Sequence, residues 1–224
     1  MLQDGAPDSR DGILSDTQRR IIEAAGEIFA DSGYRYTTVR TICRQAGVNV
    51  AAVNYHFGGK KNLYLAVLRY CRFKTMEKHP FDFEDFATGT PGSRLHAFIH
   101  TFLARVLDQG EGSRFAKLIA KELIQPTSAF DQIVREVINP GFKFLSATIG
   151  QLFGKPVSEE KTGLCCISIV GQIFYFYLST PVIRALLLKE SFDAQEIEMV
   201  ADHITRFSLY AIERMAAEDE GEGR

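Results

Sequence analysis

The chain has 224 residues, of which 46% are apolar and 24% are charged, and its formal net charge is -2. A chain of this length can bury a core of its own, and these proportions exclude a collagen, a disordered tail protein and a small disulfide-rich scaffold. The four cysteines are Cys43, Cys71, Cys165 and Cys166. They form neither a CxxC pair nor a zinc-ligand spacing, so free thiols in a reducing cytoplasm are favoured over a redox sensor.

Charge is distributed unevenly along the chain. Residues 1–79 hold 12 basic and 8 acidic residues, whereas residues 80–224 hold 14 and 20. Between Asp31 and Glu77 there are eight basic residues and no acidic one. Such a segment attracts a polyanion, whereas a solvated helix surface usually carries both signs. The pattern favours contact with nucleic acid over an ordinary solvated surface.

Helix signals follow one another from residue 15, and alternating strand patterns are nearly absent. Residues 1–14 lack a basic start followed by an apolar run, so we expect a disordered tail rather than a secretory signal. Ser15 and Gln18 form a capping box for a first helix, which Gly33 is expected to end.

A short helix, a glycine turn and a second short helix come next. Thr38 opens the first of these helices, Gly47 ends it, and Asn49 caps a second helix that extends to about Phe57. A longer helix follows from Lys60. This is the spacing of a helix-turn-helix motif, whose second helix lies in the major groove of DNA.

The rest of the chain is also predicted to be helical. The expected helices cover residues 93–109, 113–125, 127–153, 158–179 and 194–217. Pro140 should kink or split the third of them, and Pro181 should begin a short extra turn. The strongest apolar part of an uncharged run in this region, residues 164–178, is only 15 residues long, against roughly 20 for a membrane span. A buried helix is therefore favoured, with a membrane span as the alternative.

We expect the following organisation. The chain divides into a tail at 1–14, a helix-turn-helix domain at 15–60, a connecting helix at 61–79, a helical domain at 80–217 and an acidic tail at 218–224.

The run from Ile21 to Leu68 resembles the TetR family of bacterial transcriptional regulators, above all in Gly47-Val-Asn-Val-Ala-Ala-Val-Asn-Tyr-His-Phe-Gly-Gly-Lys-Lys-Asn-Leu63. The Asn54-Tyr55-His56-Phe57 form resembles the CecR (YbiH-like) branch. The chain departs from the family pattern at Asn54, where Tyr is usual, at Ala51-Ala52, where Gly-Thr is frequent, and at Thr41, where an acidic residue is common. These departures concern the operator sequence and not the fold.

The resemblance implies an all-α protein, with an N-terminal three-helix helix-turn-helix DNA-binding domain joined to a C-terminal helical ligand-binding and dimerisation domain. It implies that Thr38 caps the second helix and binds a phosphate, that Asn49 caps the recognition helix, and that Lys60 binds a phosphate. The residues implied to face base edges are Ala51, Ala52 and Asn54, and those implied to contact the DNA backbone are Tyr55 and His56. An Asn side chain can pair with adenine.

Arg40 and Arg44 also lie in this segment. The sequence supports phosphate contact and a solvated position equally well for both of them.

The resemblance further implies that the C-terminal helices form a small-molecule pocket and a homodimer interface through the last two long helices. For those helices a purely intramolecular core is the alternative. The candidate pocket residues are aromatic: Phe98, Phe102, Phe115, Phe142, Phe174 and Tyr177. Aromatic residues at helical spacing are more often plain core than the wall of a pocket, but as a group these six suit an apolar or aromatic ligand.

Other kinds of chemistry find little support. His96 and His100 are spaced to share a metal, but no acidic residue or cysteine is spaced to complete the shell, so neither a metal nor a cofactor is expected. GxSxG, P-loop, GxGxxG and HExxH motifs are absent, which argues against an enzyme.

We therefore expect a cytoplasmic, ligand-responsive regulator with no membrane partner. It would be a repressor that binds a palindromic double-stranded DNA operator as a homodimer and is released by a small, mostly apolar effector. The alternative is a helical small-molecule or lipid carrier without DNA function.

Overall fold

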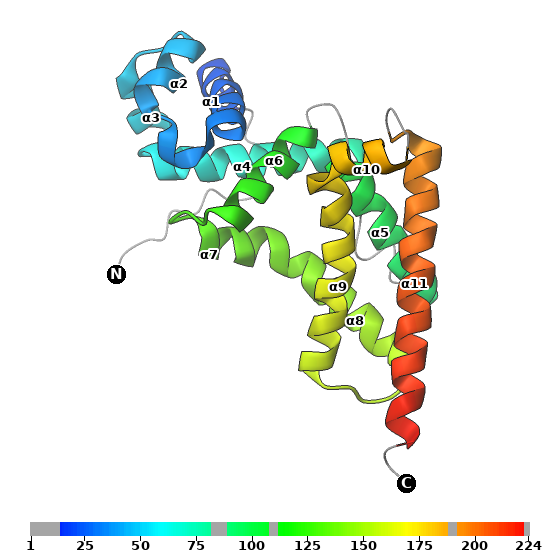
Figure 1. The fold of residues 1–224 in the computed structure, drawn as a ribbon. Helices are drawn as coiled ribbons and strands as arrows, with labels where there is room; N and C mark the ends of the chain where they lie inside the picture. The colour runs from blue at the N-terminus through cyan, green and yellow to red at the C-terminus, as the bar shows by residue number, and fades with distance from the viewer. Residues whose placement is uncertain (1–13, 82–88, 108–111, 188–191, 222–224) are drawn as a thin grey trace, which may run out of the picture. The chain divides into compact units, whose positions relative to one another are not determined.

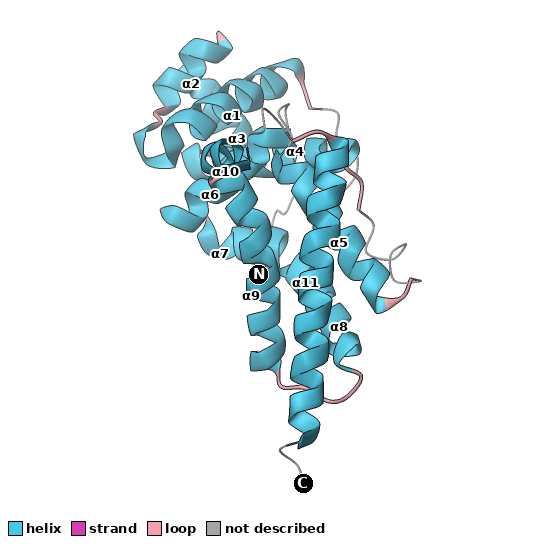
Figure 2. Ribbon diagram, turned by 45° about the vertical axis from the view of Figure 1, so that its right-hand side comes forward, coloured by secondary structure: helices cyan, strands magenta, loops and turns pink. Residues whose placement is uncertain are grey.

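The computed structural model describes residues 14–81, 89–107, 112–187 and 192–221, which contain helices and turns and no strand (Figures 1 and 2). The chain divides into two compact units, Met1–Tyr70 and Cys71–Arg224. The predicted all-α fold is confirmed. The helix α4 (Lys60–Lys78) contributes residues to both units.

The first unit is built from α1 (Asp16–Tyr36), α2 (Val39–Ala46), α3 (Val50–Phe57) and the start of α4. The predicted capping box is confirmed, because the Ser15 hydroxyl accepts from the backbone N–H of Gln18 at 3.2 Å and the Gln18 side chain accepts from the backbone N–H of Ser15 at 3.0 Å. The core of this unit includes side chains with no exposed surface: Ile21, Ala25, Phe29, Ile42, Val53, Leu63 and Val67.

Gly33 interrupts α1 but does not end it. Its backbone leaves the helical conformation with φ 79° and ψ 164°, and the helix then continues to Tyr36. The predicted end at Gly33 therefore takes the form of a break in the helix, after which a short helical stretch runs to Tyr36. The buried Thr37 hydroxyl donates to the Gly33 carbonyl at 2.7 Å, which gives the carbonyl at this break a partner.

The second unit contains the remaining helices. They are α5 (Pro91–Leu107), α6 (Gly112–Ile124), α7 (Phe130–Ile133), a π-helix (Val134–Ile138), α8 (Asn139–Phe153), α9 (Glu159–Leu178), α10 (Thr180–Leu187) and α11 (Ala194–Gly221). The extra turn expected at Pro181 is a helix of eight residues. The last helix continues through Gly221, beyond the predicted end at residue 217.

The predicted split near Pro140 is confirmed and takes the form of a π-helix that runs into α8. Proline has no backbone N–H, so Pro140 cannot donate to the carbonyl four residues earlier, that of Glu136. In the structure that carbonyl accepts a hydrogen bond from the Arg72 guanidinium at 3.2 Å. The wider helical turn and the arginine together accommodate the missing donor.

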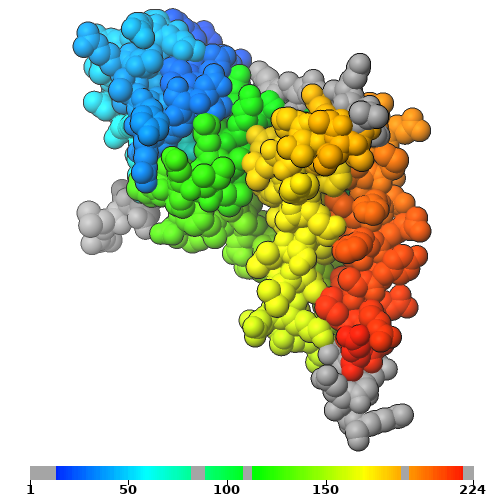
Figure 3. Space-filling model, viewed as in Figure 1, coloured from blue at the N-terminus to red at the C-terminus, as the bar shows by residue number. Residues whose placement is uncertain are grey.

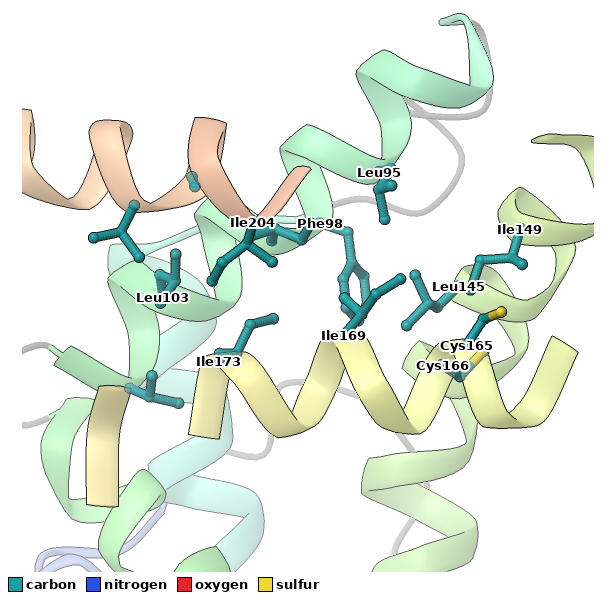
Figure 4. Packing of buried hydrophobic residues seen from close by; sticks show 14 of the residues in the cluster. Leu95, Phe98, Leu103, Leu145, Ile149, Cys165, Cys166, Ile169, Ile173 and Ile204 are labelled. Atoms are coloured by element: carbon teal, nitrogen blue, oxygen red, sulfur yellow. The ribbon is translucent and has the colours of Figure 1, made fainter. Parts of the chain in front are cut away.

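The core of the second unit lies where α5, α8, α9 and α11 meet (Figure 4). Ile169 and Ile173 of α9 face Phe98 of α5 and Ile204 of α11, and all four side chains are at least 98% buried. Cys166 packs beside Leu145 of α8. One long side of α9 is thus committed to the core.

The opposite side of α9 is apolar and exposed. Within the described residues, α9 is the helix that length and composition would allow to cross a bilayer. Its exposed large residues are Leu164, Ile167, Tyr175 and Leu178. The neighbouring α11 exposes Met199, Phe207 and Tyr210. The two helices lie side by side in the second unit, with open surface along both of them (Figure 3).

Candidate DNA-binding site

The turn between α2 and α3 has the geometry expected of a helix-turn-helix motif. Gly47 has a left-handed backbone with φ 64° and ψ 40°, and the N–H of Val48 donates to the Cys43 carbonyl at 3.0 Å. The Asn49 side chain accepts from the N–H of Ala51 at 2.9 Å and so caps α3. These contacts fix the path by which the chain enters α3.

Thr38 caps α2 as predicted. Its hydroxyl accepts from the backbone N–H of Thr41 at 3.1 Å. The Thr38 and Thr41 hydroxyls are 2.8 Å apart. Thr41 therefore occupies the place where an acidic side chain would complete a capping box, and it contacts the cap hydroxyl without adding negative charge near the helix.

Arg20 is a positioning residue that sequence reasoning missed. Its guanidinium donates to the carbonyl of Ala46 at 2.5 Å and to that of Gly47 at 3.2 Å. It thereby joins α1 to the last turn of α2, where carbonyls lack helical partners. No local motif marks this role, because the two acceptors are main-chain atoms more than 25 residues away.

The side chains of α3 divide into a buried side and an open side. Val53 is completely buried, whereas Ala51, Asn54 and Tyr55 are exposed. Ala52 and His56 are partly buried. Tyr55 is 85% exposed, an unusual position for a large aromatic side chain that has no partner surface. Small and amide side chains on the open side leave room for α3 to approach base edges.

Lys60 stands at the first position of α4, where unpaired backbone N–H groups favour an anion. Its ammonium lies 4.3 Å from the centre of the Tyr34 ring. Partial burial lowers the pKa of Lys60 below its usual value. The short distance to the Tyr34 ring is a cation–π contact, which holds the Lys60 ammonium in place.

Arg40 and Arg44 of α2 are both exposed. Each guanidinium is therefore accessible to a DNA phosphate. The same exposure is expected of an ordinary solvated arginine, so it fits both alternatives. Together with Lys60 the two arginines give the helix-turn-helix segment and the start of α4 an excess of positive charge, which is what a DNA-binding surface requires.

The second unit contains a cavity of about 320 Å³. Five of the six candidate pocket residues line it: Phe98, Phe102, Phe115, Phe142 and Phe174. Tyr177 does not line it. That residue lies about one turn beyond Phe174 on α9 and packs against the buried core cluster. Arg72 and Arg105, which sequence reasoning did not single out, also line the cavity.

His96 and His100 on α5 share an acidic neighbour that their spacing in the sequence did not reveal. The Nε2 atom of each ring lies 3.4 Å from a carboxylate oxygen of Glu198 on α11. In the described part of the chain, no group of three or more His, Cys, Asp or Glu side chains is arranged to hold a metal ion. We therefore treat the two histidines as surface partners of Glu198.

Comparisons with known proteins agree with this geometry. Residues 21–67 match the model of the bacterial regulatory proteins of the tetR family, and residues 91–212 match the C-terminal domain of the HTH-type transcriptional dual regulator CecR. The CecR regulator of Shigella flexneri is 28% identical over 199 residues, which cover 84% of this chain and 87% of that protein.

Two solved structures show the same fold. The transcriptional regulator FadR of Bacillus subtilis, solved in complex with stearoyl-CoA, superimposes with a TM-score of 0.60 at 19% identity over 85% of this chain and 97% of that one. A transcriptional regulator of Rhodococcus sp. Rha1 gives a TM-score of 0.61 at 21% identity over 87% and 96%. The family consists of transcriptional regulators and not of enzymes. This chain belongs to the TetR family of bacterial transcriptional regulators and carries a C-terminal domain of the CecR type.

Proposed function

We propose that this protein is a homodimeric repressor that binds a palindromic operator and leaves it when a small, mostly apolar effector enters the cavity. The observation that carries the proposal is the open side of α3, where Ala51, Asn54 and Tyr55 are exposed beside the cations of α2 and α4. Asn54 would read a base edge, and Thr38, Arg40, Arg44, Tyr55, His56 and Lys60 would contact the backbone.

The exposed faces of α9 and α11 support dimerisation. Leu164 and Ile167 of α9 are 60% and 64% exposed, and Phe207 and Tyr210 of α11 are 59% and 64% exposed. Two adjacent helices with such faces can pair with the same faces of a second copy to form a four-helix interface around a two-fold axis. Burial there would remove apolar surface that a monomer would leave in water.

The cavity supports a role for an effector, because α4 forms part of its wall through Arg72, Thr75 and Met76. The same helix begins at Lys60 in the DNA-binding site. A ligand that displaces α4 would therefore act on the segment that enters the helix-turn-helix unit. For a nearly complete switch it must prefer the released state by about 5.5 kcal/mol.

The test is selection of double-stranded DNA from a random pool by the full-length protein. We expect a palindromic site whose affinity falls by orders of magnitude between about 50 and 200 mM salt. Failure to enrich any site, or binding that does not depend on salt, would overturn the proposal and favour a ligand carrier without DNA function.

The direction of control needs a separate test. The related Shigella flexneri protein is named a dual regulator. We propose repression for this chain, acting in the cytoplasm, and a reporter gene placed behind the selected operator should be silenced when the protein is expressed. Increased expression of that reporter would contradict repression.

A further inference from the structure

The cavity of the second unit combines an apolar wall with two positive charges. In the described part of the chain, its lining contains the six aromatic residues Phe81, Phe98, Phe102, Phe115, Phe142 and Phe174. Arg72 and Arg105 are the only ionisable side chains among the lining residues described. The two cations therefore face a largely apolar space, and the described part of its wall contains no acidic residue.

Both arginines are held in place by main-chain carbonyls. The Nε and Nη2 atoms of Arg105 donate to the His79 carbonyl at 3.1 and 2.8 Å, just beyond the end of α4. Arg72 donates to the Glu136 carbonyl at 3.2 Å, a carbonyl to which Pro140, which has no N–H, cannot donate. Neither of these acceptors carries a full negative charge, so the contacts orient the guanidinium groups without neutralising their charges.

The electrostatic consequence appears at Arg105. Burial, together with the nearby charge of Arg72, lowers its pKa to about 10. The group is still cationic at neutral pH, and it is held close to a second cation in surroundings that solvate charge poorly. A guanidinium has five N–H donors, and the His79 carbonyl uses only two of those of Arg105.

We propose that the cavity binds a small amphipathic anion, whose carboxylate or phosphate group pairs with Arg72 and Arg105 while its apolar part lies against the phenylalanine wall. The inference rests on the proposed role of the cavity as the effector site. It adds a charged group to the effector, because a purely apolar ligand would desolvate both cations without offering them a partner.

The test measures binding to the full-length protein by calorimetry, without DNA. The probes are two anions, decanoate and 2-naphthoate, and their neutral counterparts decan-1-ol and 2-naphthalenemethanol. At least one anion should bind tenfold or more tightly than its neutral counterpart. In Arg72→Gln that anion should bind about tenfold to a hundredfold more weakly, while the neutral compound should change little.

Arg135→Gln is the matched control, because it removes the same charge from an exposed position in the π-helix outside the cavity. It should leave binding of the anion unchanged. Arg105→Gln should weaken anion binding as Arg72→Gln does. Since Arg105 also caps α4, Arg72→Gln remains the decisive variant if Arg105→Gln unfolds the protein.

The inference is overturned if neither anion binds more tightly than its neutral counterpart, including the case in which nothing binds, or if Arg72→Gln and Arg135→Gln behave alike. Binding of the neutral compounds alone would leave the proposed effector site standing and remove only its charged group. Anion binding that depends on Arg72, in a protein that selects no DNA, would support the anion site and overturn the proposed DNA-binding function.

Discussion

Gly47 shows how a single residue sets the geometry of the DNA-binding unit. Its left-handed conformation, with φ 64°, turns the chain from α2 into α3. A Cβ atom built there would lie 2.7 Å from the Nη2 atom of Arg20, the same atom that donates to the Ala46 and Gly47 carbonyls. Two separate constraints, backbone conformation and space, therefore require glycine at this position.

We expect Gly47→Ala to lower the free energy of unfolding by about 1–2 kcal/mol, because an L-residue is strained at this φ and the new methyl group displaces Arg20. Gly150→Ala is the control. Gly150 lies inside α8 with no atom within 4 Å of a built Cβ, so the substitution should raise stability by about 0.5–1 kcal/mol. Urea unfolding measures both changes, and equal effects would contradict the role assigned to Gly47.

Asn54 is the exposed amide on α3 that we expect to read a base. In Asn54→Ala, selection from a random pool should recover the same operator with relaxed preference at one position in each half-site. Arg44→Gln is the comparison, because loss of a phosphate contact weakens binding to all sequences and reduces the salt dependence. Unchanged base preference in Asn54→Ala would mean that Asn54 does not read bases.

The thiols are expected to resist modification in the folded protein. All four cysteines are buried thiols. Burial raises the pKa of Cys43 and Cys165 and, together with the neighbouring Cys165, that of Cys166 to about 11. A raised pKa lowers the thiolate fraction at neutral pH, and thiolate is the reactive form. Labelling with iodoacetamide at pH 8 should be slow until urea unfolds the chain, and rapid labelling of the native protein would contradict this expectation.

At the level of the helices, most of the first unit could be predicted because its signals are local. The Ser15 capping box, the Thr38 and Asn49 caps and the Gly47 turn each depend on residues within four positions of one another. The cavity was predictable only in part. Five of its phenylalanines were candidates, whereas Arg72 and Arg105 depend on carbonyls 64 and 26 residues away, which no spacing in the sequence reveals.

The helix ends were the least predictable feature of the elements. Gly33 leaves the helical conformation, with φ 79° and ψ 164°, and yet α1 continues to Tyr36, after which the buried Thr37 hydroxyl bonds back to the Gly33 carbonyl. The helix α11 likewise extends through Gly221 into a stretch whose acidic and glycine-rich composition predicts fraying. Local composition does not determine how far neighbouring turns support a helix.

The exposed apolar faces of α9 and α11 lead to a prediction about the oligomeric state. Leu164→Glu and Phe207→Glu should each shift the protein from dimer to monomer, because a carboxylate would be desolvated in the interface. Ser128→Glu adds the same charge at an exposed turn position that belongs to neither helix and should remain dimeric. Analytical ultracentrifugation at micromolar concentration measures the outcome, and dimers in all three variants would place the interface elsewhere.

For the molecule as a whole, the proposed homodimer links two recognition helices, so operator binding should depend on the rotational phase of the half-sites. Insertion of about 5 base pairs between them, half a helical turn, should weaken binding on the order of a hundredfold, because both helices can no longer engage at once. A control DNA with the same insertion outside the operator should bind normally. Equal affinity for both DNAs would show that each subunit binds alone.

The missing donor of Pro140 has a mechanical consequence for the effector cavity. Arg72 donates to the Glu136 carbonyl beside the cavity, so an anion that drew this guanidinium toward itself would weaken this hydrogen bond. Ligand entry and the junction between the π-helix and α8 would then compete for the same arginine. The free energy lost with the Arg72–Glu136 hydrogen bond would oppose binding in the cavity. It would thereby help to set the effector concentration at which the regulator responds.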